Sequence, residues 1–188
     1  MTTAEKNRWR RIRSNRVSPS FQLQSATTGK LISLEEFNYK RLVLAFIPGV
    51  WAPWCRRFLD QLDIPQEVAR GDIEVKFVAI ISQDYEQLYS YVRSQKLAVE
   101  VLSDPNGVIG KRYGVFDDNL TEPMRISKPS IFILDSKKNV VHSFIGLHLM
   151  DRPSVSEILE KANEPLESDS NSRNFWSFIF RKPAYAIN

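Results

Sequence analysis

The amino-acid sequence predicts an α/β domain whose central sheet contains parallel strands. Residues 41–47, 73–82 and 130–135 form short, largely apolar runs, which are typical of strands covered on both faces. Stretches with the apolar spacing of helices follow the first two runs, an order that favours right-handed crossovers between parallel strands. The chain has 188 residues, 43% hydrophobic and 26% charged, which suits one globular domain with short terminal segments.

The elements of the first half follow from local patterns. Apolar and polar residues alternate around a turn in residues 21–34, so a short strand or hairpin is expected there. The run at 41–47 is stopped by Pro48 and predicts a central strand. A helix is expected from Pro53 or Trp54, because proline is tolerated in the first turn of a helix.

The middle of the chain repeats this order. Residues 73–82 predict a second buried strand, residues 84–96 a helix and residues 99–102 a short strand. The sequence SDPNG at 103–107 is a turn signal, and the brief helix after it is expected to end near Gly114.

The last elements are a hairpin and a helix. Residues 117–128 are polar and contain proline, which predicts a loop. A strand at 130–135 is joined by a four-residue turn to another at 140–146, so the two are expected to pair antiparallel. Residues 151–162 predict the closing helix, with Pro153 in its first turn.

Charge and composition divide the chain into four segments. We expect a basic arm at 1–16, a folded domain at 17–163, a linker at 164–174 and an aromatic tail at 175–188. The arm holds six basic residues and one acidic residue, a charge of +5, which leaves −1 for the rest of a chain whose total is +4. The arm is interpreted either as a solvated segment or as a contact surface for an acidic protein, an anionic membrane or nucleic acid. Contact with nucleic acid is not favoured.

Composition also bounds the location. No apolar run approaches the roughly 18 residues that span a bilayer. One cysteine excludes an internal disulfide, and the N-terminal residues lack the apolar stretch of a secretory signal. The expected location is therefore a reducing compartment such as the cytoplasm. Within it, a position at the periphery of a membrane complex is also considered.

The tail concentrates four aromatic residues in six positions, with Arg181 and Lys182 directly after them. Three interpretations are open: it folds back on the domain, it inserts into a groove of a protein partner, or it lies at a membrane interface. Partner docking is favoured, because so few residues bury too little area to hold a membrane alone. The residues expected to bind the partner are Phe175, Trp176, Phe178 and Phe180.

Cys55 is the single sulfur nucleophile and lies where a buried strand passes into a helix. Backbone N–H groups and the positive end of the helix dipole stabilise a thiolate at such a place, and Arg56 and Arg57 add positive charge. We therefore expect the Cys55 thiol to ionise more readily than free cysteine. The alternative is that Cys55 is a small buried apolar residue.

Around Cys55 the sequence resembles a known superfamily. The segment Trp51-Ala52-Pro53-Trp54-Cys55 resembles the thioredoxin-superfamily signature at the start of the first long helix. SPSFQLQSATTGKLISLEEF, LVLAFIP, VLSDPNGVIGKRYGV and KPSIFILDSKKNVVHSFIG are similar to segments of its peroxiredoxin branch, of the alkyl hydroperoxide reductase and thiol-specific antioxidant (AhpC/TSA) type. The resemblance covers about residues 17–163 and implies a thioredoxin-like three-layer α/β/α sandwich with a mixed central sheet.

The resemblance also implies a set of site residues. Cys55 would be the reactive thiol, with Lys128 and Arg125 at or near the place of the branch's active-site arginine. Pro129 resembles the cis-proline that faces the cysteine and leaves backbone groups free for an extended substrate. Substrate contacts are expected from Pro48, Trp51, Trp54 and Pro129.

Three positions depart from the family pattern. Phe58 stands where thioredoxins have their second cysteine, which excludes dithiol exchange within this motif. Ala52 replaces the hydroxyl residue that hydrogen-bonds the peroxide, a loss of about 1–3 kcal/mol or ~10- to 100-fold in rate. Lys128 supplies charge without the planar fork of arginine.

Two functions are consistent with these residues. The first is a single-cysteine thiol oxidoreductase that reduces a peroxide or a mixed disulfide and is regenerated by an external thiol from thioredoxin, glutaredoxin or glutathione. The second is a non-catalytic module of the same fold that docks onto a larger protein or membrane assembly through its terminal segments. No cofactor and no metal are expected, because His142 and His148 lack ligand spacing.

Overall fold

The computed structural model describes residues 9–11, 16–63, 74–116 and 126–165. The strands are β1 (Arg10–Arg11), β2 (Gln22–Ser25), β3 (Leu31–Ser33), β4 (Arg41–Ile47), β5 (Val75–Ile81), β6 (Glu100–Ser103), β7 (Ser130–Asp135) and β8 (Val140–Ile145). The helices are the 3₁₀ turn η1 (Leu34–Glu36), α2 (Pro53–Leu62), α3 (Tyr85–Gln95), α4 (Val108–Arg112) and α5 (Val155–Asn163).

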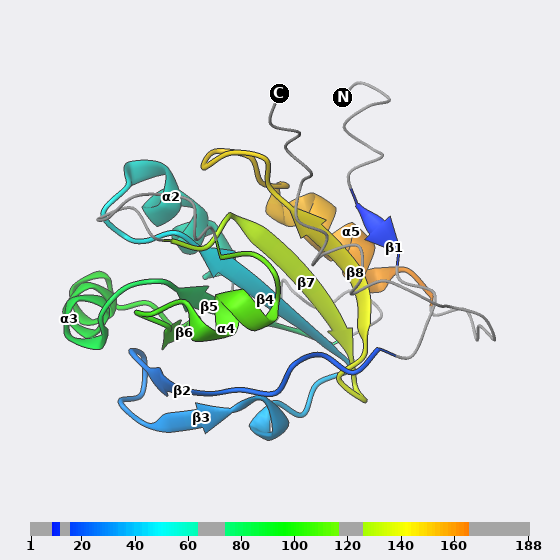
Figure 1. Ribbon diagram of the computed structural model, residues 1–188, viewed down its shortest axis with the longest axis horizontal. Helices are drawn as coiled ribbons and strands as arrows, with labels where there is room; N and C mark the ends of the chain where they lie inside the picture. Colours follow the sequence, from blue (N-terminus) through cyan, green and yellow to red (C-terminus); the bar gives the residue numbers. More distant parts are fainter. Residues whose placement is uncertain (1–8, 12–15, 64–73, 117–125, 166–188) are drawn as a thin grey trace, which may run out of the picture.

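The described strands form one mixed sheet with the order β1-β8-β7-β4-β5-β6-β2-β3 (Figure 1). Strands β4, β5 and β6 are parallel, and the chain connects them through α2 and α3. The β7–β8 hairpin and the β2–β3 hairpin add antiparallel strands on the two sides. The α/β class, the mixed sheet and the element order predicted from the sequence are confirmed.

Two apolar cores lie on the two faces of this sheet, which makes the domain three-layered. In β4, Val43, Ala45 and Ile47 belong to one core, whereas their neighbours Leu42, Leu44 and Phe46 belong to the other. The first core takes in buried residues of α2, α3 and α5, and the second takes in residues of η1 and α4. All seven residues of β4 are buried, as the apolar run predicted.

Local sequence explains where the helices begin. Pro53 is the first residue of α2, where its missing N–H leaves no hydrogen bond unmade. Ser154 caps α5 and exchanges hydrogen bonds with Glu157 in a capping box. The buried Asp104 carboxylate accepts hydrogen bonds from the Ile109 and Gly110 amides at the start of α4.

Part of the predicted basic arm belongs to the sheet. Arg10 and Arg11 pair antiparallel with Ser143 and His142 of β8. The Trp9 ring lies 6.4 Å from the ring of His142, and it packs against the first core. The packing of the partly buried Trp9 thus accompanies the pairing of this highly charged segment with β8. Of the predicted linker at 164–174, residues 166–174 lie outside the described residues, as does the aromatic tail.

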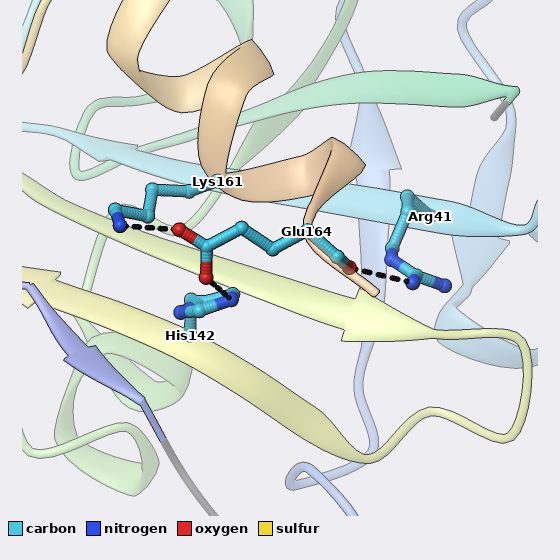
Figure 2. Close-up of polar contacts among 4 residues, drawn as sticks. All are labelled: Arg41, His142, Lys161 and Glu164. Carbon is cyan, nitrogen blue, oxygen red and sulfur yellow. Dashed lines mark hydrogen bonds and ion pairs between the residues drawn. The ribbon is translucent and has the colours of Figure 1, made fainter. Parts of the chain in front are cut away.

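The end of α5 is tied to the sheet far from the cysteine. Figure 2 shows the Glu164 carboxylate between Lys161 and the buried His142, whose Nε2 lies 3.2 Å from Oε2. The Glu164 carbonyl accepts a hydrogen bond of 3.4 Å from Arg41, the first residue of β4. These contacts fasten the C-terminal end of α5 to the sheet. Within the described part of the chain, no helix has the length and apolarity to cross a membrane.

Candidate active site

Cys55 is the third residue of α2, and the loop 48–52 leads into it from the carboxyl end of β4. Ala52 is the N-cap of α2, and its carbonyl accepts hydrogen bonds from the Cys55 and Arg56 amides. Because Ala52 has no hydroxyl, residue 52 caps the helix through its backbone alone. The strand-to-helix position predicted for the cysteine is therefore what the structure shows.

The Cys55 side chain is only 2% exposed and lines a cavity of about 10 Å³. A cavity of this size is at the lower limit for a single water molecule, so it does not hold a peroxide. Its wall is almost entirely apolar and comes from four parts of the chain. The lining residues are Phe46, Ile47, Pro48, Cys55, Phe58, Pro129, Leu149 and Arg152.

Burial raises the pKa of the Cys55 thiol above its ordinary value of 9.0. A backbone hydrogen bond from Gly49 and the positive charge of Arg152 act in the opposite direction but do not outweigh burial. The expectation that Cys55 ionises more readily than free cysteine is therefore wrong for this conformation. The helix N-terminus and the two nearby groups favour a thiolate, whereas the apolar wall withholds the water that would solvate it.

Arg152 is the cation that sequence reasoning missed. It comes from the segment before α5, and its Nη2 donates a 2.9 Å hydrogen bond to the Trp54 carbonyl. Its guanidinium lies 5.3 Å from the centre of the Phe58 ring, so Phe58, which replaces a second cysteine, supports the charge beside Cys55. No local pattern marks Arg152. The sequence pattern placed Arg152 inside the predicted closing helix at 151–162, whereas α5 begins only at Val155.

Three of the cations predicted from the sequence do not line the cysteine cavity. Arg56 and Arg57 are exposed on α2. Lys128 lines a neighbouring hollow of about 180 Å³ instead, together with Ile126, Ser127, Pro129, Leu147, His148 and Leu149. Arg125 lies outside the described residues. Among the described residues, the charge that favours the Cys55 thiolate is that of Arg152.

Two of the four residues predicted to contact substrate line the cysteine cavity. Pro48 and Pro129 line the cysteine cavity, and Pro129 also borders the larger hollow. Trp51 is 48% exposed and meets Trp54 edge to face, with ring centres 6.4 Å apart. The four tail residues predicted to bind a partner, Phe175, Trp176, Phe178 and Phe180, lie outside the described residues.

The backbone beside Pro129 is already engaged within the chain. The Lys128 amide donates to Val115, the Lys128 carbonyl accepts from the Ser130 hydroxyl, and the Pro129 carbonyl accepts from Gly146. The distances are 2.7, 3.0 and 2.8 Å. The expectation that these groups are free to receive an extended substrate is not met in this conformation.

Similarity to known proteins decides the family. The sequence profile of the AhpC/TSA family matches residues 15–143, more than half of the chain. The chain belongs to the AhpC/TSA family. Comparison with curated protein sequences finds no significant match.

Solved structures show the fold of this AhpC/TSA protein. AhpC of Enterococcus faecalis has a TM-score of 0.68 at 16% identity, covering 79% of this chain and 89% of its own. The peroxidoxin BcpB of Mycobacterium tuberculosis has a TM-score of 0.65 at 18% identity, covering 80% and 96%. A yeast mitochondrial 1-Cys peroxiredoxin has a TM-score of 0.63 at 18% identity, covering 79% and 73%. At these identities the likeness establishes the fold alone.

The described part of this AhpC/TSA chain contains no group of three or more histidine, cysteine, aspartate or glutamate side chains placed to hold a metal ion. The chemistry that the described site can support is that of the Cys55 sulfur, one backbone hydrogen bond and one guanidinium. The backbone hydrogen bond and the guanidinium favour the thiolate form of Cys55, whereas burial opposes it.

Proposed function

We propose that the protein is a single-cysteine, peroxiredoxin-like thiol oxidoreductase that uses Cys55 as its nucleophile. The observation that carries this proposal is the set of groups around the sulfur. Cys55 lies at the start of α2, with a hydrogen bond from the Gly49 backbone and the Arg152 charge both favouring its thiolate. The family membership supports it, because Cys55, the only cysteine of the chain, lies within the matched residues 15–143.

The proposed reaction is a displacement on oxygen. The Cys55 thiolate attacks the terminal oxygen of a hydroperoxide, a sulfur–oxygen bond forms and the oxygen–oxygen bond breaks. The leaving hydroxide or alkoxide takes up a proton, and Cys55 becomes a sulfenic acid. With a mixed disulfide as oxidant, the thiolate attacks one sulfur, the sulfur–sulfur bond breaks, and the other sulfur leaves as a thiolate that takes up a proton. The engaged backbone beside Pro129 favours the small oxidant over an extended peptide.

Regeneration requires thiols from outside the chain, because Cys55 is its only cysteine. One thiol condenses with the sulfenic acid, which forms a disulfide and releases water, and a second thiol then frees Cys55. Thioredoxin, glutaredoxin and glutathione are the proposed donors. The yeast mitochondrial 1-Cys peroxiredoxin of the same fold is resolved through glutathione and thioredoxin systems, which supports this choice. A reducing compartment such as the cytoplasm, or the edge of a membrane assembly within it, is the proposed location.

The oxidant reaches the sulfur only after the cavity opens. Leu149 and Arg152 come from the segment between β8 and α5 and form part of the wall over Cys55. Displacement of that segment would join the small cavity to the hollow that already borders Pro129 and Leu149. We expect this opening step to limit the rate of oxidation.

Oxidation of Cys55 tests the proposal directly. Stopped-flow kinetics with hydrogen peroxide and with an alkyl hydroperoxide should give a rate constant above that of free cysteine. Mass spectrometry should show one added oxygen atom on the peptide that carries residue 55. Cys55→Ser supplies the control for both measurements. A rate constant equal to that of free cysteine, or below it, refutes the enzymatic proposal.

A second candidate is a non-catalytic module that docks onto a larger assembly through its terminal segments. The sealed sulfur, with its raised pKa, and the missing hydroxyl at Ala52 favour it. Deletion of residues 165–188, followed by co-purification from the native source, tests the tail as the anchor. Association that persists without the tail overturns this docking mode.

A further inference from the structure

A side chain outside the cysteine loop and its helix holds that loop in place. The Val50 amide donates a 2.9 Å hydrogen bond to Oε1 of Gln83, which follows β5. Val50 is the next residue after Gly49, the residue whose backbone forms the hydrogen bond that favours the Cys55 thiolate. Of these two successive residues of the loop, Gly49 favours the thiolate through its backbone, and Val50 is hydrogen-bonded to Gln83.

Gln83 is itself fixed by several contacts. The backbone amide of Gln83 donates to the Ile81 carbonyl, and its backbone carbonyl accepts a hydrogen bond from the Ser103 hydroxyl, both at 2.8 Å. Its Nε2 donates to Gln87 in α3 at 2.7 Å. Gln83 therefore joins the carboxyl ends of β5 and β6 and the first turns of α3 to the loop that precedes Cys55.

The glycine beside Val50 allows this close approach. A Cβ atom at residue 49 would lie 3.1 Å from Gln83 Oε1 and 2.2 Å from Nε1 of the Trp51 indole. A side chain at residue 49 would therefore displace the Trp51 ring, which is 48% exposed, and crowd Gln83. A residue without a side chain suits this close approach.

We propose that Gln83 is a positioning residue for Cys55, which holds the Val50 amide and thereby keeps the Gly49 backbone directed at the sulfur. Its consequence for catalysis rests on the proposed function, whereas its effect on the ionisation of Cys55 does not. Without the acceptor, the Val50 amide turns to water and the loop loses its tie to β5. The wall over the sulfur remains, because Phe46, Phe58, Pro129 and Leu149 belong to other segments.

The test compares Gln83→Met with Gln95→Met. Both substitutions replace a glutamine by a side chain of similar size, but only the first removes the acceptor for Val50, and the exposed Gln95 of α3 contacts Ser94 and not Gln83. Because the chain has one cysteine, the pH dependence of its alkylation by iodoacetamide reports Cys55 alone. We expect Gln83→Met to lower the acid dissociation constant of the thiol about tenfold, the size of one lost hydrogen bond to a charged group. Gln95→Met should change this constant less than twofold.

A second measurement needs no variant. The Val50 amide of the unchanged protein should exchange its hydrogen far more slowly than an unstructured peptide. Exchange at the unstructured rate, an unchanged or raised dissociation constant in Gln83→Met, or equal changes in both variants each overturn the inference. Neither measurement uses peroxide, so both test the role of Gln83 even if the protein has no peroxidase activity.

Discussion

Replacing Arg152 by methionine separates the cation found in the structure from those predicted by the sequence. Arg152 reaches Cys55 from the segment before α5, whereas Arg57 lies two residues after Cys55 on the exposed side of α2. Methionine keeps an unbranched apolar stem in the wall of the cavity and removes the charge. Arg57→Met is the matched control, because it removes one charge of the same kind at a closer place in the sequence.

The size of the effect follows from the contacts of Arg152. A hydrogen bond from a charged donor, here to the Trp54 carbonyl, contributes roughly 1.5–3 kcal/mol. The contact with the Phe58 ring adds about 0.5–1 kcal/mol. Arg152 is partly exposed, so we discount these values for solvent and expect Arg152→Met to lower the free energy of unfolding by about 2 kcal/mol. Loss of the charge beside the thiolate should raise the pKa of Cys55 further above its ordinary value.

Two assays check these values. The midpoint of the pH dependence of iodoacetamide alkylation gives the Cys55 pKa separately from any change in access to the sulfur. Urea denaturation gives the stability. The reasoning is refuted if Arg152→Met leaves the midpoint unchanged, or if Arg57→Met shifts it as far. The midpoint for Arg152→Lys should lie between those for Arg152→Met and Arg57→Met, because lysine keeps the charge but not the planar contact with Phe58.

Three further predictions concern stability. Because the folded pKa of Cys55 lies above the ordinary value of 9.0, the unfolded chain loses this proton first as pH rises. The contribution of Cys55 to stability is thus present below pH 9.0 and is lost above it. The free energy of unfolding should therefore fall less steeply at alkaline pH in Cys55→Ala than in the unchanged protein. Equal slopes in the two proteins contradict this. Glu164→Ala removes the partner of the buried His142 and should cost about 1 kcal/mol in urea denaturation, and no measurable change would rule out that anchor. Asp104→Ala removes the side-chain acceptor for Gly110 and should cost about 2 kcal/mol, seen as a lower Tm, whereas an unchanged Tm would show that water replaces the carboxylate.

Local patterns sufficed for the elements because each is set by a short stretch of chain. The seven apolar residues of β4 predicted a strand covered on both faces, and the two cores confirm that cover. Pro53 predicted the start of α2 to within a residue, since proline fixes the backbone and lacks the N–H that a helix interior needs. Arg10 and Arg11 were not predicted as a strand, because their pairing depends on Trp9 finding its place beside His142 of β8.

For the candidate site, the sequence alone determined that the single thiol, Cys55, lies where a strand passes into a helix. It also determined that residue 52 carries no hydroxyl and that residue 58 is not a second cysteine. Only the tertiary structure decided how that sulfur behaves. The wall that buries it and the Arg152 charge beside it come from residues up to about a hundred positions away. Desolvation and Coulomb interactions depend on distance in space, which spacing along the chain does not report.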